Sequence, residues 1–179
     1  MHAGKTKLSA GTSFRAKPIF KSFLDELDSD KQHLLVIGVT YEYSRGADHG
    51  VTSREHKIMV DGTARWEFPY KLLLSNRNRA EFRWVDGDSR FGYRNRMLME
   101  KAIKIGRRNI APYVAAEGMW DQHYARWNQF RYTAGLQVPF IKRTSFDAYY
   151  ERVRCLTCSD LHTNVFGLTF NIYMRLKKK

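Results

Sequence analysis

The chain has 179 residues, of which 43% are hydrophobic and 14% aromatic, and this composition excludes an intrinsically disordered protein. Its 31 lysines and arginines exceed its 18 aspartates and glutamates by 13 charges, which indicates an anionic partner such as nucleic acid or an anionic membrane surface. No apolar run approaches the roughly 20 residues of a transmembrane helix. The lack of such a run does not exclude a membrane β-barrel, because barrel strands are short and only half apolar.

The predicted elements begin with a strand over residues 6–16 and a short helix near residues 18–29 whose apolar side chains share one face. A strand with apolar alternation follows over residues 33–43. Residues 44–55 are polar and contain glycine, so they are predicted to form a loop. Three consecutive strands are then expected over residues 57–68, 72–84 and 91–101.

The strand over residues 72–84 is the most informative, because its two faces differ in chemistry. One face carries Leu72, Leu74, Asn76, Asn78, Ala80, Phe82 and Trp84. The opposite face carries Leu73, Ser75, Arg77, Arg79, Glu81 and Arg83. Arginines interleaved with a glutamate predict a polar face that neutralises its own charges.

The C-terminal half predicts four further strands separated by turns and loops. They cover residues 109–119, 130–138, 146–151 and 166–172, and residues 103–108 are predicted to form a turn. Pro112 cannot donate a hydrogen bond to a ladder, so it predicts a bulge or a strand end. The whole pattern predicts an all-β, antiparallel up-and-down arrangement of roughly nine strands.

Connections in this pattern are predicted to alternate in length. The long ones are expected near residues 44–54, 85–90, 120–129 and 155–162, and the short ones near residues 69–71, 103–108 and 139–144. This asymmetry is typical of outer-membrane barrels, which have short periplasmic turns and longer external loops.

The polar faces of the predicted strands carry equal numbers of cations and acids. The cations are Lys57, Arg65, Arg77, Arg79, Arg83, Arg94, Arg96 and Arg131, and the acids are Glu42, Asp61, Glu67, Glu81, Glu100, Glu117, Asp147 and Glu151. Such pairing is what a narrow barrel lumen needs, since unpaired charges in a confined space are costly.

Aromatic residues gather at the ends of the predicted strands, as in the girdles of membrane barrels. Trp66, Phe68, Tyr70, Phe140 and Tyr173 lie near the short turns, and Tyr43, Trp84, Trp120 and Trp127 lie near the long loops. A soluble β-barrel or lipocalin-like domain is the alternative, because its strands also alternate and a charged face is usually a solvated surface.

Several segments, in their order and spacing, resemble a bacterial family known as domain-of-unknown-function family 2490. They are NRNRAEFRW, YRNRMLMEK, IAPYVAAEGMWD, WNQFRYTAGLQVP, FDAYYE and NVFGLTFNIY, within residues 33–173. The resemblance implies a β-barrel in the outer membrane of Gram-negative bacteria with no assigned activity. It divides the chain into residues 1–32 with a strand and a helical connection, a barrel over residues 33–174, and a basic tail over residues 175–179.

The chain departs from this family in two ways. Family precursors begin with a signal peptide, which is absent here, so we expect a cytoplasmic, processed or incomplete chain. Such barrels usually end on an aromatic residue, whereas Tyr173 is followed by MRLKKK. Single-chain bacterial barrels also have even strand numbers. We therefore predict either a missing N-terminal strand or a barrel of eight strands that closes without residues 7–16.

The arginines and glutamates of the predicted lumen form the main candidate site. They are Arg77, Arg79, Glu81, Arg83, Arg94, Arg96, Glu100, Glu117 and Arg131. This array could bind an anionic headgroup or a small acid, but we favour a structural role, because about eight strands leave room only for side chains. The two RNR runs would repel each other in adjacent strands, so Glu81 and Glu100 are predicted to pair with them.

Cys155 and Cys158 allow three interpretations. With His162 and His123 they could form a zinc site, but this spacing is not diagnostic. A disulfide is favoured over zinc in an oxidising compartment, and two free loop thiols are favoured over both.

Asp121 and His123 could act as the acid/base pair of an outer-membrane hydrolase, yet no activated serine or cysteine accompanies them. We expect no enzyme, cofactor or metal site. We also expect no nucleic-acid partner, because acids on the same faces match the basic strand residues. The predicted protein is a monomeric outer-membrane β-barrel with a structural or small-ligand-binding role. Its expected partners are outer-membrane lipid, lipopolysaccharide and the barrel-assembly machinery. The alternatives are a soluble basic β-barrel that binds an anionic or apolar ligand, and a lipid-modifying enzyme of the outer membrane.

Overall fold

The computed structural model describes residues 4–16, 31, 33–48, 51–106, 108–141, 144–158 and 160–172. Its elements are β1 (Gly4–Arg15), β2 (Leu35–Asp48), β3 (Val51–Phe68), the 3₁₀ turn η2 (Pro69–Lys71), β4 (Leu72–Val85), β5 (Asp88–Lys101), β6 (Ile103–Ile105), β7 (Arg108–Asp121), β8 (Arg126–Ile141), β9 (Thr144–Cys155) and β10 (His162–Ile172). The helix expected near residues 18–29 and Tyr173 lie outside the described residues. No helix in the described part of the chain is long and apolar enough to cross a membrane.

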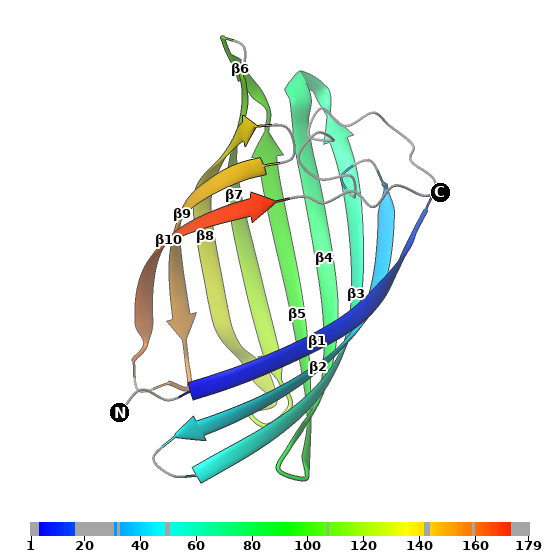
Figure 1. Ribbon diagram of the computed structural model, residues 1–179, viewed down its shortest axis with the longest axis vertical. Coiled ribbons are helices and arrows are strands. Elements are labelled where there is room, and N and C mark those ends of the chain that lie inside the picture. Colours follow the sequence, from blue (N-terminus) through cyan, green and yellow to red (C-terminus); the bar gives the residue numbers. More distant parts are fainter. Residues whose placement is uncertain are drawn as a thin grey trace.

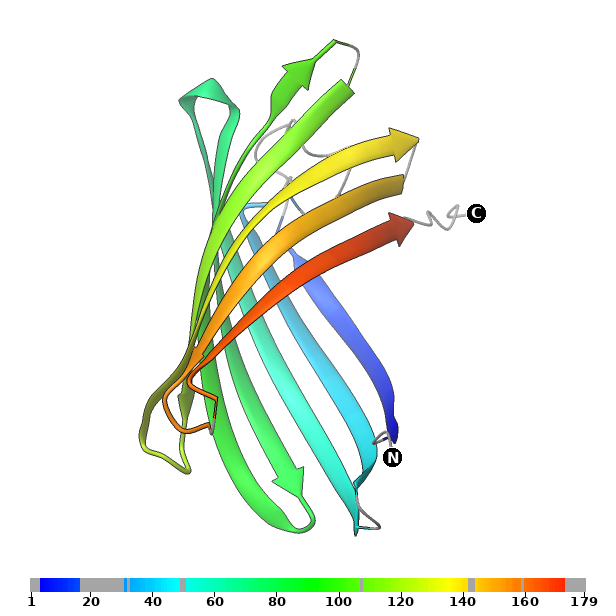
Figure 2. The same cartoon turned by 90° about the vertical axis from the view of Figure 1, so that its left-hand side faces the viewer.

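All strands belong to one ten-stranded antiparallel sheet, in the order β1-β2-β3-β4-β5-β7-β8-β9-β10, with the short β6 paired to β7 (Figure 1). Each long strand pairs with the next long strand along the chain, so the predicted all-β up-and-down fold is confirmed. The sheet is strongly curved, and its ends β1 and β10 approach the same side of the molecule (Figure 2).

The two edge strands are not hydrogen-bonded to each other among the described residues, so the sheet is open there. Residues 4–15 pair with β2 along their whole length, and the prediction that leaves this segment outside the sheet is therefore wrong. Because β1 and β10 are the first and ninth strands of an alternating antiparallel path, they run in the same direction. Direct closure between them would require parallel pairing.

The strands are longer than predicted and the connections are shorter. The predicted loop over residues 44–55 is wrong, because β2 and β3 pair out to Asp48 and Val51 and leave only residues 49 and 50 between them. Residues 103–108 likewise form a β6–β7 hairpin instead of a simple turn. An antiparallel ladder needs only backbone groups, so a segment that is polar on both faces can extend a hairpin beyond an apolar sheet surface.

The predicted alternation of long and short connections is therefore not found in the described sheet. The connections at one end are residues 49–50, 86–87, 122–125 and 156–161, and those at the other include residues 69–71, 106–107 and 142–143. The lengths of the connections therefore do not indicate a function.

The β4–β5 turn is a two-residue hairpin with Asp86 at φ 50° and Gly87 at φ 99°. Positive φ at both positions is the type I′ geometry that matches the twist of paired strands. The Asp86 carboxylate accepts a 2.8 Å hydrogen bond from the Arg54 backbone N–H, and the Asp86 N–H donates to the Arg54 carbonyl at 3.0 Å. The turn is thus fastened to the neighbouring strand β3.

Pro112 lies inside β7 and not at its end. Its ladder with β8 continues through Leu136, while the ladder with β5 stops at Tyr113 and resumes with β6 at Ile110. The missing N–H therefore coincides with the break between β5 and β6, and the irregularity predicted from Pro112 appears in the neighbouring strand.

The two faces of the sheet differ sharply in burial. The concave inner face contains the Leu73 side chain at 0% exposure and the Glu81 side chain at 1%, whereas Phe166 and Leu168 on the outer face are 83% and 75% exposed. Alternation along the strands places every aspartate and glutamate whose side chain is described in β1–β10 on the inner face. The protected interior is therefore charged, and the exposed surface is apolar.

Candidate functional site

The register of β4 and β5 sets arginines directly opposite one another on the inner face. Arg77 faces Arg96, and Arg79 faces Arg94. Like charges in directly opposed positions of an antiparallel pair destabilise the sheet unless acids intervene. Those acids come mainly from the strands on either side, β3 and β7.

Ion pairs connect many of the described residues of the inner face. They include Lys57–Glu42 at 2.9 Å, Arg77–Glu117 at 3.0 Å, Arg79–Asp61 at 2.7 Å, Arg83–Glu55 at 2.6 Å, Arg94–Glu81 at 2.9 Å, Arg131–Glu151 at 3.3 Å and Lys31–Glu100 at 2.6 Å. At the edge of the sheet Lys7 adds a second contact to Glu42 at 2.6 Å. Ion pairs thus link the strands from β1 to β7, and Arg131–Glu151 separately joins β8 to β9.

The Arg79–Asp61 pair has the geometry of a two-point clamp. Arg79 Nε donates to Asp61 Oδ1 at 2.7 Å, and Arg79 Nη2 donates to Asp61 Oδ2 at 3.1 Å. Parallel hydrogen bonds of this kind fix the orientation of both planar groups. This clamp removes Arg79 from repulsion with Arg94, which pairs with Glu81.

Sequence reasoning placed only some of these partners correctly. Glu81 does pair with an arginine of the RNR runs, but Glu100 pairs with Lys31, which lies between β1 and β2. The partner of Arg83 is Glu55, which the predicted loop over residues 44–55 had removed from the inner face. The alternation of Glu55 with Lys57 in one strand was the signal that could have identified it.

Glu117 occupies the centre of the network. Its register partner in β5 is Arg96, yet its carboxylate contacts Arg77 at 3.0 Å and Arg94 at 3.7 Å. No ion pair of Arg96 occurs among the described residues, and Arg77 Nε is buried without a hydrogen-bond partner. Both arginines line an inner cavity of about 250 Å³.

Tyrosine rings cover glycines on the inner face of β7–β10. Tyr113 lies opposite Gly135, where an added Cβ would approach its ring to 2.5 Å, and Tyr149 covers Gly167 in the same way. The Tyr113 hydroxyl contacts both carboxylate oxygens of Asp147 at 3.1 Å. Glycine is required under each ring, because a side chain there would displace it.

The predicted strand-end aromatics include five, Trp66, Phe68, Trp84, Trp120 and Trp127, that all project from the outer face. Trp66 and Phe68 lie beside the η2 turn, and Trp84, Trp120 and Trp127 lie near the β4–β5 and β7–β8 turns. The Trp127 ring packs over Gly118, and the rings of Trp120 and Phe91 pack at a tilt of 56° with centroids 6.1 Å apart. Aromatic side chains therefore mark both ends of the apolar surface.

Three asparagines interrupt the outer apolar surface and satisfy one another. Asn78 donates to Asn76 at 2.7 Å, and Asn95 donates to Asn78 at 2.8 Å. Tyr93 donates its hydroxyl to Asn78 Oδ1 at 2.5 Å, and Asn76 donates to Met97 Sδ at 2.8 Å. Mutual hydrogen bonding lowers the cost of placing these amides among apolar side chains.

The model of the family described as "Protein of unknown function (DUF2490)" matches residues 29–154. The chain belongs to this family. No curated protein and no solved structure matches the chain. The DUF2490 match extends from the connection before β2 to the end of β9 and includes the residues of the charged inner face. The family resemblance expected from the sequence motifs is thereby confirmed.

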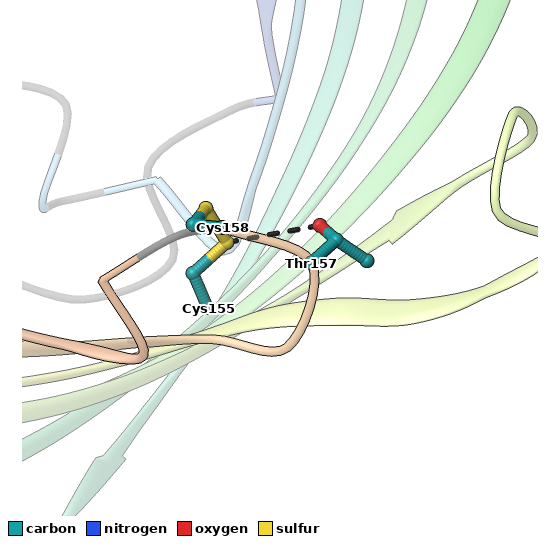
Figure 3. The surroundings of a disulfide bond; sticks show 3 residues. All are labelled: Cys155, Thr157 and Cys158. Atoms are coloured by element: carbon teal, nitrogen blue, oxygen red, sulfur yellow. Dashed lines mark hydrogen bonds between the residues drawn. A yellow bond between two sulfur atoms is a disulfide. The ribbon is translucent and has the colours of Figure 1, made fainter.

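The cysteines of this DUF2490 protein form a disulfide between Cys155 and Cys158, with their Cα atoms 5.5 Å apart (Figure 3). The favoured interpretation as free thiols is therefore wrong, since the β9–β10 turn brings the two side chains together. The Thr157 hydroxyl lies 3.7 Å from Cys155 Sγ. A disulfide offers no thiolate to zinc, and no group of metal-binding side chains gathers among the described residues.

Asp121 and His123 are close in the β7–β8 turn, but not as an acid/base pair. The Asp121 carboxylate accepts a 2.8 Å hydrogen bond from the backbone N–H of His123. The His123 ring instead packs edge-on against Tyr124, with centroids 4.9 Å apart. In this arrangement Asp121 shapes the turn and does not orient the imidazole.

Proposed function

We propose that this DUF2490 protein is a β-barrel of a Gram-negative outer membrane with a structural role and an interior filled by paired charges. Outer-membrane lipid and lipopolysaccharide are its proposed surroundings. Closure of the sheet into a barrel is part of the proposal. No catalytic residue is assigned.

The distribution of polarity across the sheet carries this proposal. Phe14, Phe166 and Leu168 expose 68%, 83% and 75% of their surface, while Glu81 and Glu100 on the inner face expose 1% and 3%. Water favours the opposite arrangement, in which charges are exposed and apolar groups are buried. A hydrocarbon solvent around the sheet accounts for both observations, because transmembrane barrels place apolar residues outside and polar residues inside.

Strand length and the outer cations support the same environment. The long strands have 11 to 18 residues, whereas about 9–11 are enough for a tilted strand to cross a bilayer. Beyond the apolar surface, near the β2–β3 and β9–β10 turns, the outer face carries exposed Arg45, Arg54 and Arg154. Cations at this level could contact the anionic groups of lipid headgroups and lipopolysaccharide.

The inner network favours a structural interior over an open pore. Ion pairs reach across neighbouring strands, as between Arg77 in β4 and Glu117 in β7, and they occupy the space inside the curved sheet. Removing one member of a buried pair leaves an uncompensated charge, so the network ties the strands to a single register.

The test is folding and partition of the purified chain. After dilution from urea into phospholipid vesicles, we expect a band on unheated gels that migrates differently from the boiled chain and stays with the vesicles through a carbonate wash. A soluble barrel would instead fold as a monomer in buffer without lipid or detergent, and this result would contradict the proposal. The chain kept in urea during contact with the vesicles is the control for nonspecific adsorption.

A further inference from the structure

We propose that the inner cavity beside Arg77 and Arg96 is a binding site for a small, multiply charged oxyanion of the phosphate type. The cavity measures about 250 Å³ and is lined by Lys31, Thr63, Arg65, Ser75, Arg77, Arg96, Leu98 and Glu100. The inference rests on the enclosed interior of the proposed barrel, but not on the solvent that surrounds the barrel.

The charges that line this cavity are unequal. Four of the lining side chains are cations and only Glu100 is an acid, and its Oε1 is already held by Lys31 at 2.6 Å. Other arginines of the inner face have a carboxylate of their own, as Arg79 has Asp61. Around this cavity the lining cations outnumber the lining acid by four to one.

Arg96 is the residue on which the proposal depends most. Glu117, its cross-strand partner, uses its two carboxylate oxygens on Arg77 and Arg94. Arg96 lies directly opposite Arg77, so the two guanidinium groups repel each other. An oxyanion between the two would convert this repulsion into two attractive contacts.

In the described structure, no nearby carboxylate of the chain occupies the position between Arg77 and Arg96. Asp147 interacts electrostatically with Arg96 and Lys31, but among the described residues it forms no ion pair with either cation. Its carboxylate oxygens instead lie 3.1 Å from the Tyr113 hydroxyl. Glu100 keeps Oε2 buried without a hydrogen-bond partner. Both carboxylates would repel an incoming anion, so its position is confined to the side of Arg77 and Arg96.

Donor chemistry favours a tetrahedral oxyanion over chloride. Arg77 Nε is buried without a hydrogen-bond partner, so an N–H group is available for a ligand oxygen. The planar guanidinium presents several N–H groups in a fixed fork that matches phosphate oxygens. Ser75 and Thr63 add hydroxyl groups to the lining. At roughly 30 Å³ per water molecule, the cavity has room for phosphate and part of its hydration shell.

The experiment is calorimetric titration of the chain, folded in detergent micelles, with sodium phosphate against sodium chloride of equal ionic strength. We expect saturable binding of one phosphate per chain. Arg96→Gln should weaken this binding at least tenfold, whereas Arg90→Gln should leave it unchanged. Arg90 is the matched control, because it lies on the same strand and the same face but outside the cavity.

Heat-dependent gel migration of each variant separates loss of folding from loss of binding, so failure of the proposed barrel is distinguishable from failure of the site. If Arg96→Gln does not fold, Arg96→Lys is the second variant, because it keeps the positive charge but lacks the N–H groups of the guanidinium. This variant should bind phosphate, but more weakly than the wild type does. Absence of saturable binding, or equal binding by the Arg96 and Arg90 variants, would overturn the proposal.

The chain carries four acids just before Lys31, and these provide a second arm of the experiment. They are Asp25, Glu26, Asp28 and Asp30. Replacing them together by amides should leave phosphate affinity within a few-fold of the wild-type value. Binding that appears only in this variant would assign the cavity to the chain's own carboxylates and would also overturn the proposal.

Discussion

An arginine on the outer face offers a direct measure of the solvent around the sheet. Val114 in β7 is 49% exposed and lines a shallow outer groove with Met99 and Ala134. At about 3.3 Å rise per residue and roughly 45° tilt, Val114 lies about 14 Å from the level of Trp120, near the middle of an apolar band about 25 Å tall. Val114→Arg should therefore cost about 2–4 kcal/mol if that band is lipid.

In water the same substitution at a half-exposed position should change stability by no more than about 0.5 kcal/mol. The assay is urea unfolding in phosphatidylcholine vesicles, followed by tryptophan emission. Ser89→Arg, on the outer face of β5 beyond the apolar band, is the matched control and should cost less than about 1 kcal/mol. Equal and small effects of the Val114 and Ser89 substitutions would refute the reasoning.

The remaining predictions use the same unfolding assay. Glu81→Gln should cost about 3–5 kcal/mol, because it removes the charge of the buried carboxylate that pairs with Arg94, and a cost below about 1 kcal/mol would contradict the role of the network. Gly135→Ala should cost about 1–3 kcal/mol, since the new Cβ overlaps the Tyr113 ring, and Tyr113→Ala in the same chain should remove most of that cost. Reducing the disulfide between Cys155 and Cys158 should cost at most about 2 kcal/mol, because the closed loop is short, and unfolding of the reduced chain at neutral pH would disagree.

Sequence patterning was sufficient for the fold and for the two faces of each strand. Alternation with period 2 depends only on strand geometry, so Leu73, Arg77 and Glu81 could be assigned to one face before the tertiary structure was known. The same parity assigned Trp66 and Trp84 to the face opposite these residues. These assignments needed no information about which strands are neighbours.

Individual ion-pair partners were only partly predictable, because they depend on strand register and on long-range approach. Arg77 reaches Glu117 past the intervening strand β5, and no sequence rule sets that reach. Lys31 meets Glu100 across 69 positions of sequence from a segment that was read as a connection. Such contacts arise only when the sheet curves.

Strand ends and connections were the least predictable features. The polarity of Arg45 and Arg54 predicts a loop, although these residues pair directly with each other in the β2–β3 ladder. Backbone hydrogen bonds tolerate polar side chains on both faces, so composition alone does not reveal where a hairpin ends. Sequence reasoning favours free thiols over the disulfide for a similar reason. The β9–β10 turn brings Cys155 and Cys158 together, and no sequence pattern predicts the path of that turn.

The central claim is that the outer face contacts lipid, and the chain's own tryptophans can test it without mutation. All 4 tryptophans, Trp66, Trp84, Trp120 and Trp127, belong to the outer face. In vesicles of phosphatidylcholine with brominated acyl chains, we predict that most of their emission is quenched, while aqueous acrylamide quenches little. Emission that brominated lipid leaves unchanged and acrylamide quenches strongly would contradict the account.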